Sequence, residues 1–230
     1  MTPKRTAQLV GVLFLIGDVM GILSVVVTGP SLGTFSEQDP SYLVKVAAQQ
    51  NTVIFGALLL LAMGLSLAFI PIVLYPVAKK FNETLAVGYL VFRGALETVI
   101  TIGMVVCGLV VVLVSQRYSV AGPSGASVVQ NAGAVLMEVH GRLNALLEIV
   151  FPVGALMLYG LLYRYRLVPW WLSGWGLVGA VLYLGAGVAF LFGPEVQWAL
   201  IPLGIQEVVM AIWLIVKGFN PSVVQEPVSG

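Results

Sequence analysis

The stretch TVIFGALLLLAMGLSLAFIPIVLYPV, residues 52–77, contains no charged side chain and no alternation of polar and apolar residues. A helix of roughly 20 apolar residues crosses the hydrocarbon core of a bilayer, so this stretch is long enough to do so. Backbone polar groups can be satisfied in lipid only within helices or closed barrels, and a barrel strand would alternate. The stretch therefore predicts a transmembrane helix.

Five further apolar blocks of similar length surround this one, in a chain of 230 residues that is 59% hydrophobic and only 9% charged. The mean hydropathy of +1.01 leaves no room for a water-soluble domain beside six spans. We expect an all-α, polytopic bundle of six transmembrane helices, forming a single domain over residues 1–218. The predicted spans are Thr6–Val27, Thr52–Val77, Leu85–Val114, Ala134–Leu162, Trp170–Phe192 and Trp198–Val216.

Two segments outside the spans look irregular. The connection Ser115–Gly133 is rich in Gly, Ser, Ala and Val and contains Pro123, which predicts a loop. The tail, residues 219–230, contains Pro221 and Pro227 and is predicted to be disordered.

The distribution of Lys and Arg predicts the orientation, because cytoplasmic loops carry an excess of these residues. Seven fall on one side and two, Lys45 and Arg117, on the other. We therefore expect both termini to be cytoplasmic. The seven are Lys4, Arg5, Lys79, Lys80, Arg164, Arg166 and Lys217.

Several classes of function have no support in the sequence. A formal net charge of +1 without clustered Lys and Arg gives no indication of nucleic-acid binding. No cofactor fingerprint is present, so no cofactor is expected. The single cysteine, Cys107, cannot form an intramolecular disulfide, and a lone His140 without Cys or a second His makes a poor metal site. No metal and no catalytic residue is predicted.

Charged side chains inside the predicted spans are the feature that any function must explain. A charge at the bilayer centre costs about 2.5 to 3.5 kcal/mol on insertion scales, so these side chains should face the interior of the bundle and find partners. Five acids face two arginines, so some carboxyls are expected to be protonated, to be hydrated or to hold a cation. The residues are Asp18, Arg93, Glu97, Glu138, Arg142, Glu148 and Glu207.

Helical spacing predicts which of these groups meet. Arg93 and Glu97 lie four residues apart on one face, and Glu138 and Arg142 repeat that spacing. A second polar face of the fourth span carries His140, Asn144 and Glu148. This span is therefore predicted at the centre of the bundle. In the sixth span Gln206 and Glu207 follow Pro202, where a kink would free backbone carbonyls.

Two stretches resemble a known family. LYPVAKKFNETLAVGYLVFRGALE, residues 74–97, and LLYRYRLVPWWLSGWGLVGAVLYL, residues 161–184, with His140 ahead of the Tyr163–Arg164 pair, look like the prokaryotic membrane proteins of domain-of-unknown-function family four-three-eight-six. The resemblance implies a six-helix protein of the prokaryotic plasma (inner) membrane. It implies no catalytic activity, and Arg93, Glu97 and His140 align with the family's recurrent polar residues.

Two classes of function remain open. The first is a small carrier or proton-linked binding protein with a carboxylate cluster near the midplane, where transporters commonly bind their substrates. The second is a non-transporting helper that binds a protein or lipid partner and whose internal charges are structural. A membrane enzyme is a third alternative without a nucleophile or metal set to support it. The candidate binding or proton-handling residues are Asp18, Arg93, Glu97, Glu138, His140, Arg142, Asn144, Glu148, Gln206 and Glu207. The small ligand or membrane partner and the oligomeric state are not specified by the sequence.

Overall fold

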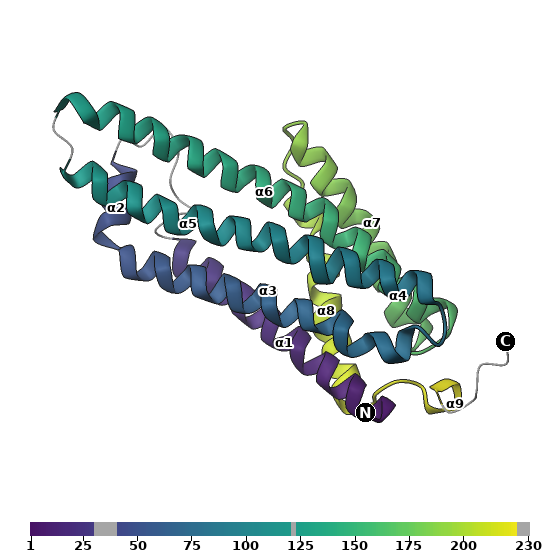
Figure 1. Cartoon of the computed structure of the whole chain (residues 1–230). Helices are drawn as coiled ribbons and strands as arrows, with labels where there is room; N and C mark the ends of the chain where they lie inside the picture. Colours follow the sequence, from purple (N-terminus) through teal and green to yellow (C-terminus); the bar gives the residue numbers. More distant parts are fainter. Residues whose placement is uncertain (30–40, 121–122, 225–230) are drawn as a thin grey trace. The chain divides into compact units, whose positions relative to one another are not determined.

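The computed structural model describes residues 1–29, 41–120 and 123–224, and this part of the chain is helical with no strand. Six of its helical segments are long and apolar enough to cross a membrane (Figure 1). The predicted fold class, an all-α protein with six transmembrane helices, is confirmed. These segments are Pro3–Thr28, Gln50–Ala78, Glu83–Val120, Ala126–Arg164, Trp170–Leu191 and Gln197–Val216.

The elements follow one another with short connections. The chain runs through α1 (Pro3–Thr28), α2 (Tyr42–Ala48) and α3 (Gln50–Ala78). The third span consists of α4 (Glu83–Tyr89), the π-helical segment η2 (Leu90–Leu96) and α5 (Glu97–Val120). It is followed by α6 (Pro123–Arg164), α7 (Trp170–Leu191), the 3-10 turn η3 (Gln197–Ala199), α8 (Ile201–Val216) and α9 (Pro221–Val224).

The predicted loop Ser115–Gly133 is wrong, because α5 continues to Val120 and α6 already begins at Pro123. Proline is well suited to the first position of a helix, where its missing N–H has no partner to lose. The serines that favour a loop are absorbed into the helix, since the Ser115 hydroxyl donates to the Val112 carbonyl and that of Ser119 to the Ser115 carbonyl. The polar composition of this segment therefore belongs to helix ends and not to a long connection.

The chain divides into two compact units, which we describe separately. Unit 1 comprises Met1–Asp18, Leu65–Val99 and Ala145–Gly230, and unit 2 comprises Val19–Gly64 and Ile100–Asn144. A single domain over residues 1–218 therefore remains a prediction.

In unit 1, glycines allow helices to approach one another closely. A Cβ atom on Gly154 of α6 would lie 3.3 Å from the Arg93 nitrogen, and one on Gly187 of α7 would lie 2.6 Å from the Glu148 carbonyl oxygen. Small residues at such crossings let the backbones pack by direct van der Waals contact, which replaces the hydrophobic effect inside a membrane. The backbone that carries Arg93 is therefore fixed against α6.

Unit 2 is built around a cluster of buried valines, Val46, Val53, Val111 and Val112. The short helix α2 supplies one of them and buries Tyr42 and Leu43 beside it. The Tyr42 hydroxyl donates to the Gln130 carbonyl of α6 at 3.2 Å. The helix therefore packs into unit 2 through its apolar face.

The C-terminal segment is ordered as far as the structure describes it. Phe219 is buried, the Asn220 N–H donates to the Leu167 carbonyl at 2.8 Å, and α9 follows. Residues 219–224 thus differ from the predicted disordered tail, because Asn220 ties them to the α6–α7 connection. Residues 225–230 lie outside the described part of the chain.

Candidate functional site

A buried arginine bridges two carboxylates in unit 1. Arg93 Nη1 lies 3.2 Å from Glu97 Oε2, and Arg93 Nη2 lies 3.2 Å from Glu207 Oε1. The Arg93 side chain is 3% exposed, and those of Glu97 and Glu207 are 6% and 10% exposed. Charge-assisted hydrogen bonds of this kind are stronger than neutral ones, and two of them here join the third span to α8.

The local backbone at Arg93 departs from the α-helix. Asn82 caps α4 by accepting the Leu85 N–H at 2.9 Å, and the helix then passes into the π-helical turns of η2, which carry Arg93. Short π-helical segments are rare and occur frequently at functional sites. Glu97 is the first residue of the α-helix that follows.

Aromatic rings cover the faces of the guanidinium. Arg93 Cζ lies 4.5 Å from the centre of the Phe151 ring and 5.8 Å from that of Phe14. A desolvated cation over an aromatic face gains about 2 kcal/mol. The cation is thus held by carboxylates at its edge and by rings on its faces.

Further polar groups surround this pair of ion bridges. Asp18, Tyr89 and Tyr159 interact electrostatically with Arg93. Among the described residues no hydrogen-bond partner is found for Asp18 Oδ2, for the hydroxyls of Tyr89 and Tyr159, or for Gln206 Oε1. Buried polar atoms are nearly always hydrogen-bonded in proteins, so a group of them around one guanidinium is itself a reason to regard the region as functional. We call Asp18, Tyr89, Arg93, Glu97, Tyr159, Gln206 and Glu207 the Arg93 cluster.

The structure brings together four of the charged residues that the sequence singles out: Asp18, Arg93, Glu97 and Glu207. The spacing of four predicts the bridge between Arg93 and Glu97, whereas the pairing with Glu207 could not be read from positions 114 residues apart. The Gln206 amide also belongs here and donates to the Leu172 carbonyl at 3.1 Å.

Glu148 lies on α6 in the same unit and is half-buried. It interacts electrostatically with Tyr183, which also interacts with Glu207, Glu97 and Arg93. Glu148 is therefore linked to the Arg93 cluster through the surroundings of Tyr183 and stands at its edge.

Glu138 and Arg142 form an ion pair as their spacing predicts, with 3.4 Å between Arg142 Nη2 and Glu138 Oε1. Their side chains are 59% and 68% exposed, so the expectation that they face the interior of the bundle is wrong. They lie on an outward face of α6, which at 42 residues is longer than the predicted span. An exposed pair of this kind contributes little to stability.

Unit 2 contains a separate cavity of about 380 Å³. His140 and Asn144 of α6 line it together with Cys107 of α5 and Ser24 and Thr28 of α1. The two hydroxyls are occupied, since Ser24 donates to the Gly56 carbonyl and Thr28 to the Ser24 carbonyl. The remaining wall is largely apolar, and both the size and this composition are typical of small-molecule sites.

The aromatic members of the site are not among the residues that the sequence predicts. Tyr89 lies four residues before Arg93, as Glu97 lies four after it, and this spacing is a signal that could have found it. Phe14, Phe151 and Tyr159 lie in apolar runs, where an aromatic residue gives no distinguishing signal. Within residues 1–29, 41–120 and 123–224 no group of three or more His, Cys, Asp or Glu is arranged to hold a metal ion.

Six apolar helices enclosing a buried arginine between two carboxylates define a multi-pass helical membrane protein. Residues 9–218 match the family described as Domain of unknown function (DUF4386), and the chain belongs to this family. No curated protein and no solved structure matches the chain.

Proposed function

We propose that this protein is a small carrier or proton-linked binding protein whose Arg93 cluster holds an exchangeable proton. The observation that supports this proposal is the imbalance of charge in the cluster. Asp18, Glu97 and Glu207 share one guanidinium, that of Arg93. Inside a membrane an uncompensated carboxylate is costly and takes up a proton instead.

Asp18 gives the cluster a route for that proton. Glu97 and Glu207 are both bonded to Arg93, whereas Asp18 is half-buried and keeps Oδ2 without a partner among the described residues. A proton that moves between Asp18 and Glu207 changes the distribution of negative charge around Arg93. The cluster thereby has two charge states that a bound ligand could favour differently.

We propose the cavity of unit 2 as the ligand site. Its wall is mainly apolar, with His140 and Asn144 as polar groups on α6. Such a wall fits a small, mostly apolar molecule with one or two hydrogen-bonding groups. The same helix continues into unit 1, where it carries Phe151 against Arg93.

We further propose that the protein resides in the plasma membrane of a prokaryote with both termini cytoplasmic. The seven-to-two distribution of Lys and Arg supports the orientation, and the resemblance of residues 74–97 and 161–184 to prokaryotic proteins supports the location.

A second candidate function is a non-transporting helper whose internal charges are structural. One observation favours it: both Glu97 and Glu207 are already bonded to Arg93, and neither the unit 2 cavity nor the cavity near Trp213 is lined by these residues. In that case the cluster would lock helices together in one fixed charge state.

Infrared spectroscopy of the purified protein across a pH titration separates the two candidates. The proton-linked function requires the band of a protonated carboxyl at neutral pH that is lost in Asp18→Asn or Glu207→Gln. Glu138→Gln is the matched control, because its carboxylate is exposed and outside the cluster. A wild-type protein without such a band would contradict the proton-linked function and favour the structural one.

A further inference from the structure

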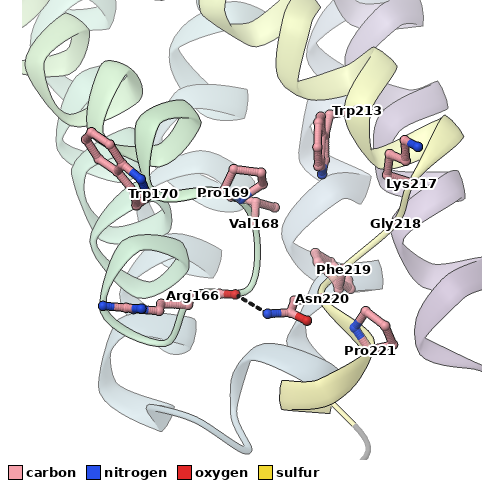
Figure 2. Close-up of a pocket in the computed structure, with 10 residues that line it drawn as sticks. All are labelled: Arg166, Val168, Pro169, Trp170, Trp213, Lys217, Gly218, Phe219, Asn220 and Pro221. Carbon is pink, nitrogen blue, oxygen red and sulfur yellow. Dashed lines mark hydrogen bonds between the residues drawn. The ribbon is translucent and has the colours of Figure 1, made fainter.

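A second cavity, of about 420 Å³, lies in unit 1 where three membrane-spanning helices end. Helix α6 ends at Arg164, α7 begins at Trp170 and α8 ends at Val216, and the cavity is enclosed by the segments between and after them. Figure 2 shows Pro169 and Trp170 on one side and Trp213 on the other, with Asn220 below.

Specific contacts hold the walls of this cavity in place. The Asn220 side chain donates to the Arg166 carbonyl at 3.3 Å, and the Asn220 N–H donates to the Leu167 carbonyl at 2.8 Å. Trp213 packs edge-on against Trp171, with 6.3 Å between the ring centres. Two left-handed backbone positions, Arg166 with φ 52° and Gly218 with φ 73°, turn the chain around the cavity.

The groups around the cavity favour an anion. Arg166 and Lys217 are exposed at its edge, and none of the described residues that line it is Asp or Glu. Figure 2 shows the indole nitrogen of Trp213 facing the segment that carries Phe219 and Asn220. The N-terminus of α7, a helix of 22 residues, also lies here, and the first N–H groups of a helix carry partial positive charge without an intrahelical acceptor.

The position of the cavity identifies the source of the anion. Trp170, which is 68% exposed, and Trp213 stand at the ends of membrane spans, where indole rings favour the headgroup level of a bilayer. Apolar side chains, Val168, Pro169 and Phe219, form the rest of the wall and suit the glycerol end of a lipid better than free phosphate.

We infer that this cavity binds the phosphate headgroup of an anionic phospholipid, with Arg166 and Lys217 turning onto the phosphate. The site is independent of the Arg93 cluster and of the proposed carrier function. A basic pocket between membrane helices is a recognised mode of binding anionic headgroups.

Native mass spectrometry of the delipidated full-length chain in a neutral detergent tests this site. The titrants are a short-chain phosphatidylglycerol, the phosphatidylcholine with the same chains, and inorganic phosphate. We expect phosphatidylglycerol to bind more tightly than the other two. Arg166→Gln with Lys217→Gln should weaken its binding about tenfold, since each Lys or Arg near a surface contributes roughly 1 kcal/mol toward anionic lipid.

The matched control is Lys79→Gln with Lys80→Gln, which removes the same charge from exposed residues of unit 1 that do not line the cavity. Its binding of phosphatidylglycerol should stay close to that of the wild type. An equal loss in both double variants would overturn the site, because general surface charge would then account for the binding. Inorganic phosphate or phosphatidylcholine binding as tightly as phosphatidylglycerol would overturn the lipid assignment.

Discussion

Glu207 Oε1 lies 3.2 Å from Arg93 Nη2, although the two residues are 114 positions apart in the chain. The bond joins the last long helix, α8, to the η2 segment of the third span. Together with the bond to Glu97, it satisfies both Nη atoms of a side chain that is 3% exposed. Loss of the guanidinium would leave two carboxylates facing each other in an apolar environment.

Arg93→Ala is therefore expected to destabilise the protein by about 3 to 5 kcal/mol, the cost of breaking a buried ion pair from one side. Thermal unfolding in detergent measures the effect. Arg142→Ala is the matched control, since it removes the same side chain from an ion pair that is 68% exposed on the arginine side. That control should cost less than about 1 kcal/mol. Equal losses of stability would show that the Arg93 bridges contribute nothing special.

Gly187→Ala should lower stability by about 1 to 3 kcal/mol, because the new Cβ would lie 2.6 Å from the Glu148 carbonyl oxygen and force α6 and α7 apart. Gly185→Ala on the same helix has no atom within 4 Å of its Cβ and should leave the unfolding midpoint unchanged or slightly raised. The comparison is sharp because the two changes are chemically identical and two residues apart. A destabilised Gly185→Ala with an unaffected Gly187→Ala would contradict the packing of these helices.

Asn82→Ala should cost about 1 kcal/mol, since it removes the side chain that accepts the Leu85 N–H at the start of α4. Hydrogen exchange of residues 83–89, followed by mass spectrometry, should accelerate in this variant. Asn82→Ser restores a capping oxygen and should recover most of the protection. Exchange that is unchanged in Asn82→Ala would mean that tertiary packing alone holds this helix start.

Cys107 provides a probe of the unit 2 cavity, since it is the one cysteine of the chain and lines that cavity. We expect a small neutral maleimide to label it in the folded protein faster than a bulky charged one. Gly108 lines the same cavity, and a Cβ atom added to it would have no neighbour within 4 Å, so Gly108→Leu should fill the space and slow labelling. Labelling rates that do not depend on residue 108 would contradict access through the cavity.

Reporter fusions test the orientation. A fusion after Gly230 should report a cytoplasmic location, and an insertion between Val120 and Pro123 should report the opposite side, because three of the six spans separate these two points. An external C-terminus would refute the orientation predicted from Lys and Arg.

The sequence predicts most of the fold because uninterrupted apolar runs such as residues 52–77 leave a helix as the only membrane structure. It fails at Ser115–Gly133, where Ser and Gly resemble a loop but bond and pack within long helices. At the site it predicts the Arg93–Glu97 bridge, since a spacing of four fixes proximity on one helix. The pairing of Arg93 with Glu207 depends on how α8 packs, which no local pattern encodes. The exposure of Glu138 and Arg142 also depends on packing and is not encoded locally.

The bridge between the third span and α8 also constrains the order of biosynthesis. A chain is made from its N-terminus, so Arg93 and Glu97 enter the membrane before Glu207 has been synthesised. Until α8 arrives, the guanidinium has only the carboxyl of its own span and that of Asp18 to face. The final insertion step thus closes the charge network, and a nascent chain that stops before residue 207 retains an incompletely paired arginine that a membrane quality-control protease could recognise.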